Sequence, residues 1–300
     1  MPITSSTVVD LLDANLNEFF QDGVSAWDEQ YSQIFKIRSS DKQSEKNSYE
    51  SGFGIMPEKA EGVAATYDAI LPGIAKTYLH KTYALGYEIT EEAVEDNQRT
   101  GESFSKLPEA LSRSAIETVE VTAANVVNNG FTNTGFDGTS LFATDHPDLD
   151  GGEQANRPTV DADLSITSLT AGLTAIDKYT DERGLKRPTQ AKILAVPSDQ
   201  WNIAEELLSS EFEPFSANNE VNALQKKDLQ YFVWKYLTDT DAWMLFSDKE
   251  ETGLTFYWRV RLGALKRGTD FDSTNLKHLA RMRFSVDYDH WRGTYASRGA

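Results

Sequence analysis

The histidines and cysteines of a chain are the first residues to examine for acid–base or metal chemistry. Cysteine is absent, which excludes disulfides, thiolate metal sites and cysteine nucleophiles. The four histidines, His80, His146, His278 and His290, are far apart, and no two have a metal-ligand spacing such as HExxH. The sequence therefore predicts no metal-binding residues.

The segment from Asp145 to Gly151, DHPDLDG, resembles a calcium-binding loop at first sight. An EF-hand loop needs alternating oxygen ligands before its glycine and a glutamate six residues after it. Here His146 occupies the first ligand position and Arg157 the last, so the pattern fails. A turn built on aspartate and proline is the favoured interpretation.

Ser140, Asp145 and His146 are the residue types of a hydrolase triad, but they lie in one loop without a G-x-S-x-G elbow. No glycine-rich phosphate loop occurs either. Three aromatic side chains could stack on a sugar or a base, although aromatic residues on strands more often form sheet core; they are Trp234, Tyr257 and Trp258. We therefore predict no catalytic or cofactor-binding residues, no cofactor, and a protein that is not an enzyme.

The charge of the chain restricts its partners. The 300 residues carry a formal net charge of -18, which argues against a surface that binds nucleic acid by phosphate neutralisation. The sequence has no apolar run long enough to span a membrane, and its first residues do not have the pattern of a signal peptide. The charge is more consistent with a soluble protein that does not adhere to DNA, even when it lies beside it.

The charge is also unevenly distributed. Residues 1–30 hold six acidic residues and no basic ones, whereas residues 258–300 hold nine lysines and arginines against four aspartates. The acidic segment and the basic tail could pair within one chain or between neighbouring copies, or both could be solvated surfaces. Reversal of the charges at Asp10, Asp13 and Glu18 would distinguish these alternatives.

A long amphipathic helix over residues 108–129 is the element around which the rest is arranged. Apolar residues recur at steps of three or four at Leu111, Ala115, Val119, Ala123 and Val126. Pro108 suits the first helical position, and Gly130 suits the left-handed residue after the helix. The stripe is rich in small residues and predicts close packing against neighbouring backbone.

Before this helix the pattern predicts an N-terminal helix over residues 5–22 and two strand-like arms, 31–38 and 76–89, around a polar section. Because an isolated two-stranded ribbon is barely stable in water, we expect a neighbouring molecule to support this excursion. Thr90 is expected to cap a short acidic helix through Asp96.

After the long helix, glycine- and proline-rich residues 131–158 predict a series of turns. A helix is expected over 165–180, a strand over 191–196, and a helix capped by Ser198 through Leu208. Further strands are expected over 229–237, 242–247, 254–262 and 281–288, the first two joined as a hairpin. The fold class is α+β.

Three segments in this order resemble landmarks of the Mu-like major head subunits of tailed phages. They are Gly138–Pro147 with Gly151, Gly152 and Asn156; Leu85–Glu92; and Asp289–Tyr295. The resemblance implies a Hong Kong 97-type capsid fold. It assigns residues 1–34 to an N-terminal arm, 35–88 to an extended E-loop β-hairpin, 89–159 to a P-domain with spine helix 108–129, 160–275 to an A-domain, and 276–300 to a C-terminal return to the P-domain.

The resemblance implies a major capsid protein that self-assembles into hexamers and pentamers of an icosahedral shell around double-stranded DNA. The expected partners are further copies of the chain, a portal, a separate scaffolding protein and a decoration protein, with no membrane. Assembly is expected in the host cytoplasm and the product in the virion. The alternatives are a cytosolic α/β enzyme or carbohydrate-binding module using residues 138–157, or a phage tail or connector protein.

Two features of this family, a scaffolding segment and a crosslinking lysine, do not match this sequence fully. Many such proteins carry a long N-terminal scaffolding segment, whereas only about thirty residues precede the expected E-loop here. Some members also crosslink an E-loop lysine to a neighbour's asparagine. Lys59, Lys76 and Lys81 are candidates by location, with ordinary surface lysines as the alternative.

Overall fold

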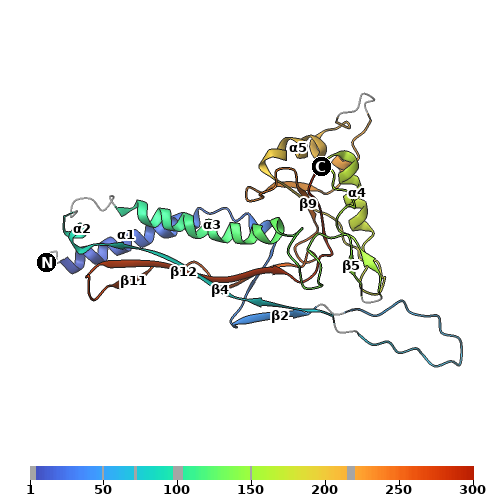
Figure 1. The fold of residues 1–300 in the computed structure, drawn as a ribbon, viewed down its shortest axis with the longest axis horizontal. Coiled ribbons are helices and arrows are strands. Elements are labelled where there is room, and N and C mark those ends of the chain that lie inside the picture. The colour runs from blue at the N-terminus through green and yellow to red at the C-terminus, as the bar shows by residue number, and fades with distance from the viewer. Residues whose placement is uncertain (1–4, 49–50, 71–72, 97–103, 149–150, 215–219) are drawn as a thin grey trace.

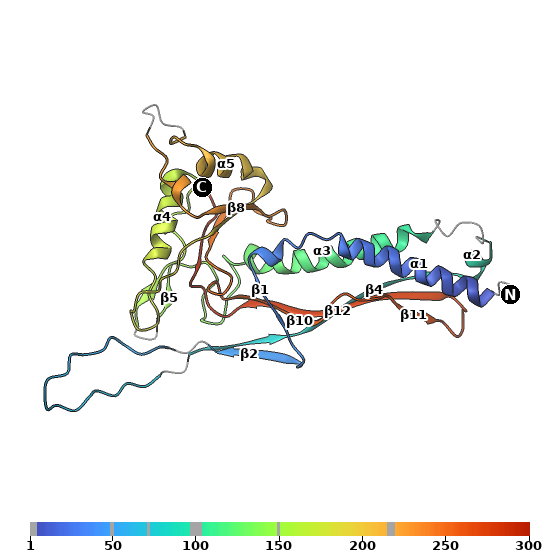
Figure 2. The ribbon, with the colours of Figure 1, turned by 180° about the vertical axis from the view of Figure 1, so that it is seen from behind.

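The molecule consists of an elongated body, a lobe at one end of the body, and a loop that projects past the lobe (Figures 1 and 2). The computed structural model describes residues 5–48, 51–70, 73–96, 104–148, 151–214 and 220–300, with the backbone alone for 5–13 and 94–96. Within these residues no helix is both long and apolar enough to cross a membrane. The observed mixture of helices and strands agrees with the predicted α+β class.

The body contains a five-stranded sheet, the long sheet, organised around one strand. β12 (Leu276–Tyr288) pairs antiparallel with β10 (Leu254–Val260) and β11 (Lys266–Thr269) along one edge and with β4 (Lys81–Ile89) along the other. β1 (Lys36–Ser39) extends the sheet by pairing parallel to β10. The strand predicted over 281–288 therefore begins five residues earlier, and β11 had not been predicted.

Two long helices cover one face of the long sheet (Figure 1). α1 (Ser5–Ser25) lies along α3 (Lys106–Asn128), and both helices were predicted. Leu16 and Phe20 of α1 are fully buried, as is Val119 of α3. The short helix α2 (Glu91–Asp96) begins after Thr90, whose hydroxyl accepts a hydrogen bond from the Ala93 amide, as the sequence predicts for a cap.

The positions predicted for Pro108 and Gly130 at the two ends of α3 are wrong. The helix begins at Lys106, so Pro108 is its third residue. Gly130 is not in the left-handed conformation: its amide donates to the Val127 carbonyl at 2.8 Å, and Asn129 is the cap residue. A Cβ at Gly130 would lie 2.9 Å from the Phe142 ring, so glycine serves close packing here. The expected stripe is buried except at Val126, which is half-buried while Val127 is buried.

The lobe contains a second sheet with the strand order β13-β9-β7-β8. Its strands are β7 (Ile193–Val196), β8 (Gln230–Val233), β9 (Trp243–Phe246) and β13 (Thr294–Ser297). β8 and β9 were predicted as a hairpin, but β7 lies between them, parallel to β8 and antiparallel to β9. The segment that connects β8 to β9 is anchored on α3. The Asn128 side chain donates to the Tyr236 carbonyl and accepts from the Thr238 amide.

Two helices pack in the lobe. α4 (Ile166–Asp177) has Ser165 as its cap, with a reciprocal hydrogen-bonded box to Ser168. α5 (Trp201–Ser209) follows the 3-10 turn Ser198–Gln200, so the prediction that Ser198 caps this helix is wrong. A further 3-10 turn, Leu224–Lys226, precedes β8. One apolar core joins the lobe to the body through the long sheet and α3.

The residues that follow α1 do not all form the strand that their alternating sequence predicts. Tyr31–Gln33 is a 3-10 turn, because the buried Tyr31, Ile34 and Phe35 follow helical rather than strand spacing. β2 (Ser44–Ser48) lies within the polar run and pairs with β3 (Ala75–Leu79). β10 and β11 belong to the long sheet and β13 to the sheet of the lobe, whereas the domain boundaries drawn from the resemblance stay a prediction.

Candidate assembly surface

The β2–β3 ribbon is supported by its own chain, which corrects the expectation that only a neighbour could support it. Tyr78 is buried against Tyr257, with ring centroids 5.1 Å apart. The His80 ring lies 2.9 Å from the Ser285 hydroxyl, and Lys76 Nζ lies 2.6 Å from an Asp287 carboxylate oxygen. These contacts place the ribbon on the face of the long sheet opposite the helices.

The segment beyond the ribbon, residues 51–70, projects past the lobe without helix or strand (Figure 1). We call it the projecting loop. Its exposed apolar side chains include Phe53 (56% exposed), Ile55 (78%), Met56 (93%) and Tyr67 (94%). Such a concentration of exposed large apolar groups marks a surface that is covered by another molecule.

A basic surface occupies the outer face of the long sheet, opposite the helices. Along β12, Ala280, Met282 and Phe284 are buried toward the helices, so the alternate residues face outward. We define the basic strip by its outward residues on β11 and β12; they are Lys266, Lys277, Leu279, Arg281 and Arg283. Lys277 pairs with Glu88 and Asp270, whereas Arg281 forms no ion pair with the residues that the structure describes.

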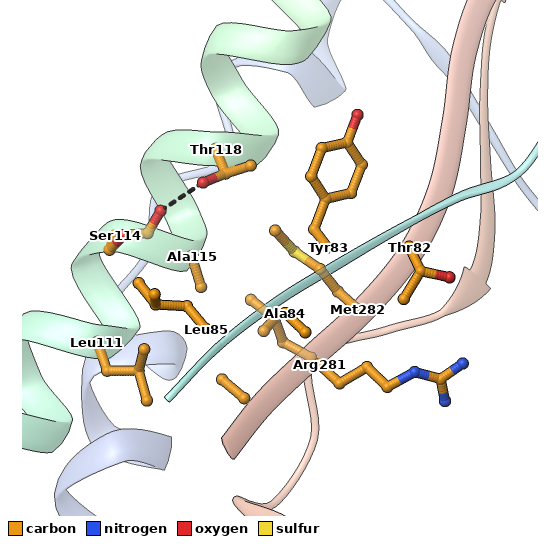
Figure 3. Close-up of a pocket in the computed structure, with 12 residues that line it drawn as sticks. Thr82, Tyr83, Ala84, Leu85, Leu111, Ser114, Ala115, Thr118, Arg281 and Met282 are labelled. Carbon is orange, nitrogen blue, oxygen red and sulfur yellow. Dashed lines mark hydrogen bonds between the residues drawn. The ribbon is translucent and has the colours of Figure 1, made fainter. Parts of the chain in front are cut away.

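A groove of about 300 Å³ opens between α3 and the edge strand β4 (Figure 3). Leu85 of β4, still 55% exposed, faces Leu111 and Ala115 of α3 across it. Thr118 donates to the Ser114 carbonyl on its helical wall, at 2.8 Å. β4 pairs on one side only, with β12, in the described part of the chain. The groove therefore lies beside an open sheet edge, where a further extended segment can pair.

A buried carboxylate joins the N-terminal segment to α3. Glu120 is 1% exposed and accepts hydrogen bonds from Trp27 Nε1 at 3.0 Å, the Gln30 amide at 2.9 Å and the Tyr31 amide at 3.0 Å. Burial raises the pKa of the Glu120 carboxyl, and the three hydrogen bonds oppose that rise. Glu120 therefore determines where the chain leaves α1 and enters the 3-10 turn.

The acidic segment and the basic tail pack together without an ion pair among the described residues: the Leu265 amide donates to Asn17 Oδ1 at 3.0 Å, and Leu16 clusters with Leu276. The side chains of Asp10 and Asp13 lie outside the described residues, and no ion pair of Glu18 is observed among those described. Arg259 pairs instead with Asp41, and Arg292 with Asp148 and Glu182. The pairing between neighbouring copies stays a prediction.

The three residues considered for a hydrolase triad do not come together. Asp145 is exposed, and Ser140 donates to the Phe142 carbonyl. The fully buried His146 contacts Asp137 instead, with 2.7 Å between Nδ1 and the carboxylate. Between β5 (His146–Pro147) and β6 (Glu153–Gln154), the Gly151 amide donates to the Asp148 carbonyl at 3.0 Å, which agrees with the predicted turn; residues 149–150 of that turn lie outside the described residues. No cluster that could hold a metal ion is found among the described residues.

Hydrogen bonds fix the position of the His146 ring. Asn156 uses its Nδ2 to donate to the Leu141 carbonyl and Thr294, and its Oδ1 lies 3.1 Å from His146 Nε2. Trp291 stacks on the His146 ring, with ring centroids 4.4 Å apart. Burial would raise the pKa of Asp137, but the interactions with His146 and Thr139 together outweigh burial and lower that pKa.

The aromatic residues considered for ligand stacking form sheet core. Trp234 is fully buried, and Trp258 donates to the Tyr31 hydroxyl at 3.1 Å. Tyr257 is 4% exposed and donates to Asn47. Among the lysines considered for crosslinking, Lys59 of the projecting loop and Lys81 are exposed, while Lys76 is paired with Asp287. Crosslinking stays a prediction.

Two residues that hold the projecting loop, Asp68 and Arg183, were not predicted from the sequence. Arg183 donates to Asp68 from both guanidinium nitrogens, at 2.8 and 3.1 Å. Residues 181–184 (DERG) have the composition of a turn, which could have been recognised. No local pattern could have indicated a partner more than one hundred positions away.

Known proteins share both sequence features and fold with this chain. A family model described as phage capsid protein matches residues 74–297. The decorated capsid of bacteriophage JBD30 aligns with a TM-score of 0.57 at 15% identity, over 73% of this chain and 94% of the other. The capsid of cyanophage P-SCSP1u aligns at 0.55 and 10% identity, over 90% and 88%. A virus-like particle from Pyrococcus furiosus aligns at 0.53 and 9% identity, over 95% and 98%. No curated protein sequence matches the chain.

Proposed function

Because this chain belongs to the family of phage capsid proteins, we propose that its copies assemble into the hexamers and pentamers of an icosahedral head. The chain is a major capsid protein with a Hong Kong 97-type fold, a structural component of the virion shell. The family model does not distinguish a Mu-like branch, so membership of that branch stays a prediction. The comparisons give no support to an enzyme, a carbohydrate-binding module or a tail component.

The projecting loop is the observation that carries the proposal. Residues such as Ile55, Met56 and Tyr67 expose most of their surface in the single chain. At roughly 25 cal/mol per Å² of apolar area, covering several such side chains contributes several kcal/mol to an interface. A neighbouring subunit that covers the loop gains this free energy, which drives association.

The basic strip and the adjoining groove are the surface that we propose for the neighbour's loop. The loop carries Glu58 and Glu61, which complement Arg281 and Arg283. The loop projects at the lobe end, whereas the strip extends toward the N-terminal end of the body (Figure 2). Within one chain the loop cannot reach the strip, so the contact joins two copies head-to-tail. Such contacts form a ring when successive rotations from copy to copy return to the first copy.

The remaining partners follow from the same assignment. A shell that encloses double-stranded DNA is compatible with the net charge of -18, since an acidic protein does not bind DNA nonspecifically. We propose a portal, a separate scaffolding protein and a decoration protein as further partners, with assembly in the host cytoplasm. The JBD30 capsid is decorated with minor capsid protein trimers, which motivates the last of these.

Negative-stain electron microscopy and sedimentation of the purified protein test the proposal. The wild-type protein is expected to form closed shells. The Ile55→Ser/Met56→Ser variant is expected to remain folded and to form few or none, because the loop loses its apolar contact area.

The matched control is Val160→Ser/Val221→Ser, which changes two exposed apolar residues elsewhere (78% and 61% exposed) and should leave shells unchanged. A wild-type protein that stays a small compact species would contradict the proposal. Open rings or tubes would instead indicate a connector or tail protein.

A further inference from the structure

The base of the projecting loop is closed by one carboxylate. Asp68 accepts hydrogen bonds from the Gly54 amide at 3.0 Å and from the Ala69 amide at 2.8 Å. It thereby joins the outgoing and returning arms of the loop. The pKa of Asp68 is lowered, first by the Gly54 amide and also by Ala69 and Arg183, so the carboxylate is charged at neutral pH.

Arg183 of the lobe binds this closed base. Besides its two hydrogen bonds to Asp68, the guanidinium donates to the Ala69 carbonyl at 3.2 Å and the Gly52 carbonyl at 3.4 Å. One side chain therefore contacts both arms of the loop at once. We call Arg183 and Asp68 the loop clamp. A planar guanidinium can bind a carboxylate in this two-pronged way, whereas a lysine cannot.

The turn that carries Arg183 is itself ordered. The Asp181 side chain accepts from the amides of Arg183 and Leu185, both at 2.9 Å. Gly184 has a φ of 77°, a left-handed conformation that glycine adopts without strain. The turn therefore presents the Arg183 guanidinium from a defined position.

A buried arginine connects this turn to the interior of the lobe. Arg292 is 2% exposed and donates to the Thr180 carbonyl at 2.8 Å, to Glu182 at 2.5 Å and to Asp148 at 2.6 Å. Because Arg292 lies between β12 and β13, the turn is tied to both sheets. Arg292, the turn and Arg183 therefore connect the interior of the lobe to the projecting loop.

We propose that Arg183 is a positioning residue for assembly: through Asp68 it determines the direction in which the projecting loop extends from the β2–β3 ribbon past the lobe. The loop otherwise exposes nearly all of its residues, so a few contacts at its base control where its tip lies. That direction selects the position at which a neighbour receives the loop, and so the angle between subunits. The consequence for assembly rests on the proposed function, while the effect on the loop itself does not.

Arg183→Gln tests the proposal in two measurements. In dissociated subunits, the Gly54 and Ala69 amide hydrogens, which are bonded to Asp68, are expected to exchange roughly two- to fivefold faster, the change typical of losing one exposed ion pair. Assembled particles are expected to show a broader range of diameters by electron microscopy. Arg183→Lys keeps the charge without the two-pronged geometry and should give an intermediate result.

Lys186→Gln is the matched control, because it removes one exposed charge from the same turn and should change neither measurement. Asp68→Asn provides a second variant on the other side of the clamp and should reproduce the effect of Arg183→Gln. Unchanged exchange in both clamp variants would overturn the proposal, and so would unchanged particle diameters. If the wild-type protein formed no shells, the proposed function would fail, yet exchange in the subunits would still decide whether the clamp holds the loop.

Discussion

At the residue scale, one buried carboxylate and one buried histidine–aspartate pair hold together segments that are distant in sequence. Glu120 joins α3 to the chain leaving α1, and the His146–Asp137 pair holds the turns after α3 against Trp291. Neither has a local signature, because a buried carboxylate and an exposed one look the same in sequence. The sequence named Asp145 rather than Asp137 as the acid beside His146, and the absence of a catalytic or metal-binding role for His146 stays a prediction.

Asp137→Asn is expected to lower the free energy of unfolding by about 1.5–3 kcal/mol at pH 7, the range for a hydrogen bond to a charged group. The pKa of Asp137 is lowered from 3.8, so the folded state favours the carboxylate. Its contribution is fully present above that ordinary value and is lost as the pH falls below about 4. Urea unfolding of dissociated subunits at pH 7 and pH 3 measures both quantities.

Asp145→Asn is the control for this experiment, because Asp145 is exposed and should change stability by no more than about 0.5 kcal/mol. The difference between wild type and Asp137→Asn should shrink at pH 3. A difference that stays constant with pH would show that the carboxylate charge is not what stabilises this region.

At the element scale, the β2–β3 ribbon illustrates how an element acquires support that its sequence does not show. Its strands alternate in burial, with Tyr78 inside and Leu79 outside. The alternation predicts one covered face, but it cannot say whether the cover is the same chain or another. Here the long sheet supplies it, through Tyr257 and Ser285.

Tyr78→Ala is expected to destabilise the subunit by about 3 kcal/mol, because removing a fully buried aromatic ring leaves a cavity. Leu79→Ala, one residue away on the exposed face, should change stability by less than about 0.5 kcal/mol. Thermal unfolding gives the stabilities, and amide exchange in β2 and β3 should rise in Tyr78→Ala alone. Equal effects of the two substitutions would mean that the ribbon is not packed on the long sheet.

The helices and most strands could be predicted because their periodicity is local. α1, α3 and α4 follow from apolar spacing, and the α2 cap follows from Thr90. Strand pairing could not be predicted in the same way. β8 and β9 are neighbours in sequence, yet β7 separates them in the sheet, because pairing is decided by which strands share the core. An excursion between two strand-like arms was predicted, whereas the residues that hold the base of the projecting loop were not.

At the scale of the whole molecule, the acidic N-terminal segment (residues 1–30) and the basic tail (residues 258–300) carry charges of opposite sign. If they pair between copies, replacing Asp10, Asp13 and Glu18 by lysine should weaken assembly. Rising salt concentration should also weaken wild-type assembly, because exposed charges are screened beyond about 8 Å at physiological ionic strength. Light scattering of assembly reactions over a salt series measures both effects.

The control changes the net charge by the same amount at exposed acidic residues of the lobe region, by replacing Asp145, Glu153 and Asp199 with lysine. This variant should assemble as the wild type does. Unchanged assembly of the N-terminal variant would mean that the charges of the segment and of the basic tail do not pair between copies.

β12 has a mechanical consequence for the particle. Its thirteen residues span about 43 Å, and hydrogen bonds bind it to other strands along both edges. Flexing such a rod would stretch bonds on one edge and compress them on the other, while α1 and α3 brace one face. Subunits at sharply and gently curved places of a shell must therefore keep the same straight body. The difference in curvature has to be absorbed at the joints between rigid subunits.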